Sequence, residues 1–488
     1  MQVIYLQYEE NSFYPGRNSL YHPHSIYPEY PWNQSDISLA INPVYEMVRE
    51  CLHGLGMDVE HFGQLGWNPL GDLIRHGDTV LIKPNWVSHR NKNPEIRDDL
   101  ECLVTHPSVV RAVFDYVSIA LSETGKIIIA DAPMQGTDLD ALFDIAGYRE
   151  LFNFISQKNA NVVIADLRKY RVQEKNGVLS KPFYIDDSAG SVTVELDKGS
   201  AHSENDSKAF SYKVSDYLTE ETKAFHASGR HAYEINRYAL EADVIINLPK
   251  PKCHRLAGMT GAMKNMVGII YDKASLPHRA EGDTETGAGD AYEKRSLLKR
   301  WMHEMDDRKI MAEREGKVWS AKLSDLVAKA CYIVSRTFKG DGYRIGGWYA
   351  NDTVWRTVAD LYRIILFADM SGRMQNEPQR RILTVGDMIV CGDKDGPIGP
   401  SPKKLGVIMA SDSMVLFDKV ICRIMGFDEE KIKSLSWLES NSAIGKEEVL
   451  LHSNIPEVDA KPLDKLTFSA EWHFEPHSCW KGHIERQR

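Results

Sequence analysis

The stretch "ADVIINLPKPKCHRLAGMTGAMKNMVG", residues 242–268, decides the fold. Its first part, ADVIINLPK, is a continuous apolar run that ends in polar residues, which is typical of a strand covered on both faces in a mostly parallel sheet. Its second part is cationic, although the chain carries a formal net charge of -10. We therefore ask why a cationic segment directly follows a buried strand.

Other apolar runs show the same pattern, and helix-like segments such as 106–125 lie between them. Helix 106–125 has a proline just inside its start and a glycine at its end. Alternating strands and helices predict an α/β fold, with a mostly parallel sheet flanked by helices. The further predicted strands are TVLIKPN (79–85), GKIIIADAP (125–133), ANVVIADL (160–167), RILTVGDMIV (381–390) and KLGVIMASD (404–412).

Composition along the chain predicts three parts. One of them contains a helical region, at about residues 290–340, whose mixed charge predicts solvated helix faces and no binding surface. The parts are an N-terminal extension with an aromatic, proline-rich loop (1–78), an α/β core (79–430) with a polar insertion at about 169–240 and a helical region at about 290–340, and a C-terminal tail (431–488).

Bulk composition argues against several classes of protein. Fifty-nine basic residues against 69 acidic ones give no polycationic field for nucleic acid. No apolar run reaches the roughly 20 residues that span a bilayer, and no signal peptide is recognisable. Seven scattered cysteines without a CxxC pair argue against an iron–sulfur cluster. We expect a cytoplasmic protein with neither a nucleic-acid nor a membrane partner; the oligomeric state stays open.

The cationic segment predicts an anion-binding site. Flanking prolines hold the chain extended, so Lys250 and Lys252 fall on the same side and His254 follows at the same spacing. Lys264 and Asn265 lie near a predicted helix start, where backbone N–H groups suit phosphate or carboxylate. The alternative interpretation is a set of surface lysines with a helix cap.

Polar residues also end other predicted strands. Lys83 and Asn85 follow the first strand, Asp131 follows the next, and Asp412 ends the last. In open α/β sheets ligands bind outside the carboxyl ends of the strands, so these side chains could meet there. For Asp131 and Asp412 taken singly, an ordinary exit into a polar loop explains the pattern equally well.

Two C-terminal elements add candidates. Asp352 and Arg356 have the i, i+4 spacing of a helical ion pair, and Arg356 is also a candidate anion ligand. Asp387 lies in a predicted strand and Asp395 in a following Gly/Pro loop. Such carboxylates could hold Mg²⁺, although DKDG is also simply a good turn.

The chain resembles the family known as domain of unknown function 362, in a longer subgroup without the ferredoxin-like module of many relatives. In that family the recurrent polar positions fall here on Lys83, Asn85, Lys252, His254, Lys264, Asn265 and Gly268. The resemblance implies a site, and membership of a biosynthetic pathway such as polysaccharide synthesis, but no particular reaction. The motifs that carry it are VLIKPNWV, KIIIADAP, ADVIINLPKPKCH, GAMKNMVGI, LPH, GDKDGPIG and SDSMVLFDKVICRIMGFD.

Three functional hypotheses follow. The first is an enzyme acting on a phosphorylated or carboxylated small metabolite, with His254 or His278 transferring a proton. Nearby lysines would keep such a histidine neutral and able to act as a base. The second is a non-catalytic protein that binds or senses the same anion. The third is a redox partner using Cys253, whose cationic neighbours would favour a thiolate.

Overall fold

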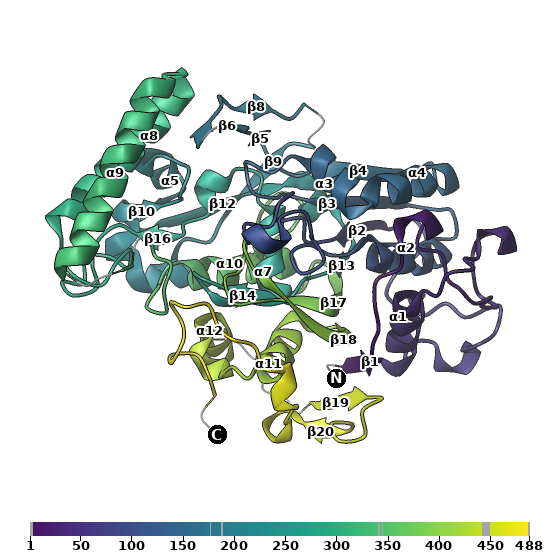
Figure 1. The fold of residues 1–488 in the computed structure, drawn as a ribbon. Coiled ribbons are helices and arrows are strands. Elements are labelled where there is room, and N and C mark those ends of the chain that lie inside the picture. The colour runs from purple at the N-terminus through teal and green to yellow at the C-terminus, as the bar shows by residue number, and fades with distance from the viewer. Residues whose placement is uncertain are drawn as a thin grey trace.

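A computed structural model describes residues 3–175, 177–186, 189–339, 342–343, 345–441 and 449–486. A few residues of the predicted insertion, helical region and tail lie outside these ranges. The predicted fold class is confirmed, because helices flank a large, mostly parallel central sheet (Figure 1). None of the helices within the described ranges has the length and apolarity needed to cross a membrane.

The central sheet has the strand order β20-β19-β1-β18-β17-β13-β2-β3-β4, and β14 and β15 extend it beside β17. All six predicted strands are present. The run β17-β13-β2-β3-β4 is parallel, whereas β18 is antiparallel to both β17 and β1. The strands are β1 (Ile4–Tyr8), β2 (Thr79–Lys83), β3 (Lys126–Asp131), β4 (Val162–Asp166), β13 (Val244–Asn247), β14 (Lys252–His254), β15 (Gly258–Thr260), β17 (Arg381–Asp393), β18 (Ser401–Ser411), β19 (Leu450–Ser453) and β20 (Lys461–Pro462).

Helices cover both faces of this sheet. Side chains alternate along β2, so Val80 and Ile82 pack in the core under α1, α2 and α4, and Leu81 packs in the core under α10 and α11. The helices are α1 (Pro43–Gly54), α2 (Pro107–Leu121), α3 (Leu139–Ala146), α4 (Tyr148–Lys158), α5 (Thr219–Lys223), α6 (Arg237–Glu241), α7 (Ala262–Asn265), α8 (Leu297–Glu315), α9 (Val318–Lys339), α10 (Val354–Phe367), α11 (Met414–Met425) and α12 (Lys433–Asn441).

The polar insertion forms small sheets of its own. Strand β12 pairs with β9 and β11, and the other short strands pair in twos, β5 with β8, β6 with β7, and β10 with β16. These strands are β5 (Tyr170–Arg171), β6 (Glu174–Lys175), β7 (Val178–Leu179), β8 (Phe183–Tyr184), β9 (Ser191–Glu195), β10 (Tyr212–Lys213), β11 (His226–Ala227), β12 (Arg230–Asn236) and β16 (Arg279–Ala280).

Both ends of the chain contribute strands to the central sheet. From the N-terminal extension, β1 lies antiparallel to β18, and from the tail β19 lies parallel to β1. The yellow strands β19 and β20 therefore lie next to the purple β1 in Figure 1. One sheet thus joins the N-terminal extension, the core and the tail.

The predicted helical region is a hairpin of α8 and α9 at the edge of the molecule (Figure 1). Its helices are confirmed, but the expectation of solvated, charged faces is wrong for α9. Trp319 is 85% exposed and Phe338 is 83% exposed, and several other large apolar side chains of α9 also face solvent. The sequence did not indicate these exposed apolar side chains, because charged residues lie between them along the chain.

Candidate functional site

Two of the predicted anion-binding lysines are neutralised by buried carboxylates. At the end of β2, Lys83 Nζ lies 2.8 Å from Asp131 Oδ1, at the end of β3. Lys250 Nζ lies 2.7 Å from Asp387 Oδ2 on β17, and neither side chain is exposed. The Tyr14 hydroxyl also donates to Asp387. These lysines have their own counter-ions, so they position strand ends instead of offering a free charge.

Gly268 allows the backbone to approach the first of these ion pairs. A Cβ atom at this position would lie 1.8 Å from Asp131 Oδ1 and 2.6 Å from Lys83 Nζ. The Gly268 carbonyl also accepts a hydrogen bond from the Ala132 N–H, 2.8 Å away. Glycine is therefore required here by close packing, since any side chain would separate the ion pair.

A chain of amide side chains ties three of the predicted residues together. Lys252 Nζ donates to Asn85 Oδ1 at 2.8 Å, and Asn85 Nδ2 donates to Asn265 Oδ1 at 2.9 Å. Asn265 Nδ2 in turn donates to Asn247 Oδ1 at 2.7 Å. The ends of β2 and β13 and the helix α7 are thus locked in one geometry around Lys252.

The predicted anion site at the start of α7 is already filled by a side chain. The N–H groups of Ala262 and Met263 donate to the Asp418 carboxylate, at 2.5 and 3.1 Å. Gly261 permits this contact, since a Cβ there would lie 2.0 Å from Asp418 Oδ1. Burial raises the pKa of Asp418 to about 7. The expectation that a ligand anion caps α7 is therefore wrong, because Asp418 caps it.

Close to these elements lies a set of lysines and histidines, which we call the lysine–histidine cluster: Lys252, His254, Lys264, Lys273 and His278. In the described part of the chain, no hydrogen bond or ion pair reaches Lys264 Nζ. Burial lowers the pKa of Lys264 to about 8. The free cation of the predicted site is therefore Lys264.

Burial also lowers the pKa of the other lysines in the cluster. Burial, followed by the charge of Lys250, lowers the pKa of Lys252 to about 7. Burial likewise lowers the pKa of Lys273 to about 7, although its Nζ donates to the Ala132 carbonyl at 2.9 Å. Like charge and low polarity both disfavour protonation here, and a bound anion would reverse that effect.

Both predicted catalytic histidines belong to this cluster. Burial, followed by the charge of Lys264, holds the pKa of His254 well below its ordinary value. The same two causes lower the pKa of His278 to about 3. Both directions agree with the expected neutral imidazoles. His254 Nδ1 accepts the N–H groups of Leu256 and Ala257, whereas His278 Nδ1 is buried without a partner in the described structure.

A shallow recess adjoins Lys264. Met259, Trp355 and Val358 provide apolar walls, and Lys264 and Asp418 line it as well. The recess is shallow, with room for about one water molecule, so a metabolite could enter only if its walls moved apart.

The remaining predicted ligands lie apart from the cluster's free charge. Arg356 is paired with Glu204 at 2.9 Å and with Asp352 at 3.2 Å. Asp387 is bound by Lys250, whereas the Asp395 side chain is 69% exposed beside His477. The structure thus does not bring these two carboxylates into one site. Among the described residues, no group of three or more His, Cys, Asp or Glu side chains is placed to hold a metal ion.

Cys253 does not have the environment expected of a reactive thiol. It lies in β14, where side chains alternate, so it points away from its cationic neighbours. Its Sγ lies 3.4 Å from the Glu475 carbonyl and 3.9 Å from Asp393. Burial and the charge of Asp393 raise the pKa of Cys253 well above its ordinary value. The expectation of a favoured thiolate is wrong.

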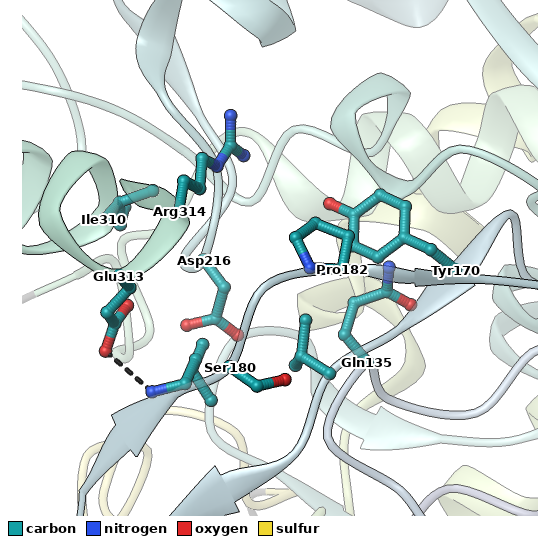
Figure 2. Close-up of a pocket in the computed structure, with 10 residues that line it drawn as sticks. Gln135, Tyr170, Ser180, Pro182, Asp216, Ile310, Glu313 and Arg314 are labelled. Atoms are coloured by element: carbon teal, nitrogen blue, oxygen red, sulfur yellow. Dashed lines mark hydrogen bonds between the residues drawn. The ribbon is translucent and has the colours of Figure 1, made fainter. Parts of the chain in front are cut away.

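A second shallow recess lies between the insertion and α8 (Figure 2). Asp216 and Glu313 line it, and Glu313 accepts the Leu179 N–H at 2.9 Å. Gln135 also lines it, and neither of its amide atoms has a partner among the described residues. Arg314 is held by both oxygens of Glu221. The unpaired polar groups that line this recess are acidic or neutral, so the recess is distinct from the lysine–histidine cluster.

Sequence reasoning missed Lys273, Asp418 and Asp131's role as partner of Lys83. Lys273 follows the recognised motif GAMKNMVGI, and that position was its only signal. Asp418 lies far along the chain in α11, and nothing in its local sequence indicates a contact with α7. Such contacts depend on tertiary packing, which residue spacing does not encode.

Fold and geometry together define an α/β protein with buried cationic groups near the carboxyl ends of its parallel strands. The chain belongs to the family described as domain of unknown function (DUF362), whose model matches residues 80–194 and 171–423.

One curated relative is the thylakoid-associated protein sll1697 of Synechocystis, which is 25% identical over 204 residues. That match covers 42% of this chain and 43% of the relative, so the chain spans less than half of it. A solved protein from Thermotoga maritima is 10% identical with a TM-score of 0.30, over 82% of this chain and 59% of that one.

Proposed function

We propose that the protein is an enzyme that binds an anionic small metabolite, carrying a phosphate or carboxylate group, at the lysine–histidine cluster. The observation that supports this proposal is Lys264, a partly buried cation without a counter-ion among the described residues. Holding an unpaired ammonium group out of water is costly, and a ligand anion would remove that cost. Lys83 and Lys250, by contrast, carry their counter-ions within the chain.

The cluster also offers groups for proton transfer. A neutral imidazole can take a proton from a bound substrate near pH 7, and His254 and His278 are both neutral. His278 Nδ1 is buried without a partner among the described residues, so it has no competing hydrogen bond if a ligand reaches it. The apolar walls beside Lys264 would contact the uncharged part of the metabolite once the shallow recess opens.

The wider setting belongs to the same proposal. Seven unpaired cysteines support a reducing compartment, so we place the protein in the cytoplasm. We further propose a role in biosynthesis, which rests on the resemblance described above. Phosphorylated metabolites commonly carry Mg²⁺, so the ligand could bring a divalent ion to the site.

A thermal-shift screen tests the proposal. The panel contains inorganic phosphate, pyrophosphate, nucleotides, sugar phosphates and dicarboxylates, each with and without Mg²⁺. A ligand at a hundredfold excess over its Kd stabilises the native state by about 2.7 kcal/mol. We expect at least one anion to stabilise the wild type and not Lys264→Met. Lys461→Met, an exposed lysine on β20, is the matched control.

Turnover then separates an enzyme from a sensor. The stabilising anion is incubated with the protein and its possible co-substrates, and products are followed by mass spectrometry. Conversion that is lost in His254→Ala or His278→Ala supports the enzyme. An anion that binds but returns unchanged supports a non-catalytic binding protein, and no shift with any anion contradicts both.

A further inference from the structure

The large apolar side chains of helix α9 face solvent instead of packing against α8. The residues that face inward are small: Ala321, Ser324, Ala328, Cys331 and Ser335, all at most 9% exposed. The opposite face carries Trp319, Leu323, Leu326 and Ile333, which are 62 to 85% exposed. Contiguous apolar patches of this kind mark interaction surfaces, because they gain free energy when covered.

The outward residues form a regular seam, which we call the α9 seam: Trp319, Leu323, Leu326, Ala330, Ile333 and Thr337. Their spacing alternates between four and three residues, which is the spacing of helices that pack side by side. Val327 and Val334 widen the seam along one border, and both are also partly exposed. The shape that fits such a seam is another helix.

The charged residues along the other border of the seam indicate which charge a partner helix should carry. Lys322, Lys329 and Arg336 each precede a seam residue, at intervals of seven, so all three line one border. Lys329 is partly neutralised by Asp325, 2.6 Å away, and Lys322 lies 5.8 Å from the ring of Trp319. Residues at such border positions select the partner helix by charge.

A second copy of α9 fits this border poorly. In an antiparallel pair, the basic border would face its own copy, and like charges at these positions oppose pairing. In a parallel pair it would face Ser320, Val327 and Val334, which offer no acid. An acidic border on the incoming helix satisfies the same positions.

We infer that the α9 seam binds an amphipathic helix of a partner protein whose apolar stripe is bordered by aspartate or glutamate. This surface is separate from the lysine–histidine cluster, and the inference does not depend on the proposed enzymatic function. It adds a protein partner to a chain for which only a small molecule was expected.

Two synthetic 21-residue helical peptides, with leucine at every seam-facing position, test this inference on the full chain. One carries glutamate at both borders and the other carries lysine. We expect the glutamate peptide to bind more tightly, by roughly tenfold or more, and the difference to shrink with added salt. The triple variant Lys322→Glu/Lys329→Glu/Arg336→Glu should reverse the preference.

Two further variants serve as controls. Leu326→Gln/Ile333→Gln should abolish binding of both peptides while circular dichroism stays unchanged. Lys461→Glu/Lys465→Glu, which alters exposed lysines in the tail, should leave the preference intact.

Equal binding of the two peptides, or none, would overturn the inference. So would a dimer in sedimentation that Leu326→Gln/Ile333→Gln dissociates, since the occupant would then be a second copy. Seam-dependent binding to phosphatidylglycerol vesicles, without peptide binding, would point to a lipid surface instead.

Discussion

Lys250 and Lys264 come from the same cationic stretch, yet their surroundings differ. Lys250 is fully buried against Asp387 and a tyrosine hydroxyl, so its charge is cancelled within the chain. Lys264 lies near His254 and His278 without a paired carboxylate among the described residues, and burial lowers its pKa to about 8. The comparison teaches that a lysine-rich motif can serve two purposes, one structural and one open to a ligand.

We expect the largest loss of stability when the buried ion pair between Lys250 and Asp387 is broken. Asp387→Ala leaves Lys250 buried without its carboxylate, and breaking a buried pair costs about 3–5 kcal/mol. Urea unfolding of the variant measures this loss. The double variant Lys250→Met/Asp387→Leu should recover most of it, because no uncompensated charge remains. A loss below about 1 kcal/mol in Asp387→Ala would show that the pair does not hold the strand ends.

Gly268→Ala should act on the other ion pair. The new methyl group would meet Asp131 Oδ1 and Lys83 Nζ, and overpacking of this kind costs about 1–3 kcal/mol. The same unfolding experiment measures it. Gly136→Ala is the matched control, since no atom lies within 4 Å of its Cβ position. Equal losses in both variants would refute the close approach.

Removing the unpaired Lys264 should have the opposite effect on the free energy of unfolding and stabilise the protein. Lys264→Met removes a partly buried ammonium group without a partner among the described residues, so we expect the ligand-free protein to gain about 1 kcal/mol near pH 7. The pKa of Lys264 is lowered to about 8 in the folded state, and the unfolded state binds the proton more tightly. Wild-type stability should therefore rise between about pH 8 and pH 10 relative to the variant.

Denaturant titrations of both proteins at several pH values test this sign. A loss of stability in Lys264→Met at pH 7, with no dependence on pH, would mean that Lys264 has a counter-ion. The comparison with Lys250 would then fail.

The smallest effect is expected at Cys253. Its thiol is buried with a raised pKa, so Cys253→Ala should cost about 1 kcal/mol and leave the ligand-induced thermal shift unchanged. Alkylation of the native protein should be far slower at Cys253 than at a free thiol. Rapid alkylation would restore the redox hypothesis.

Much of the fold was predictable from local pattern. Buried parallel strands such as β2 and β13 are continuous apolar runs, which few other structures require. The strands β1 and β19 are short and pair with each other from opposite ends of the chain, so their sequences carry little signal. The order of the strands follows from tertiary packing.

The candidate site was predictable in part. Lysines and histidines near the strand ends could be identified from their spacing, but which of them are neutralised could not. Asp387 and Asp418 decide that question through contacts with residues more than 130 positions away. Local sequence also could not show that the large residues of α9 face solvent, because helical periodicity does not say which stripe is buried.

Proton uptake on ligand binding shows whether Lys264 is the cation that receives the anion. The anion with the largest thermal shift is titrated calorimetrically at pH 8 in two buffers of different ionisation enthalpy. Because an anion raises the pKa of nearby lysines, we predict that the wild type takes up protons on binding and that Lys264→Met takes up fewer. Binding without proton uptake, and with equal affinity in the two proteins, would contradict the account.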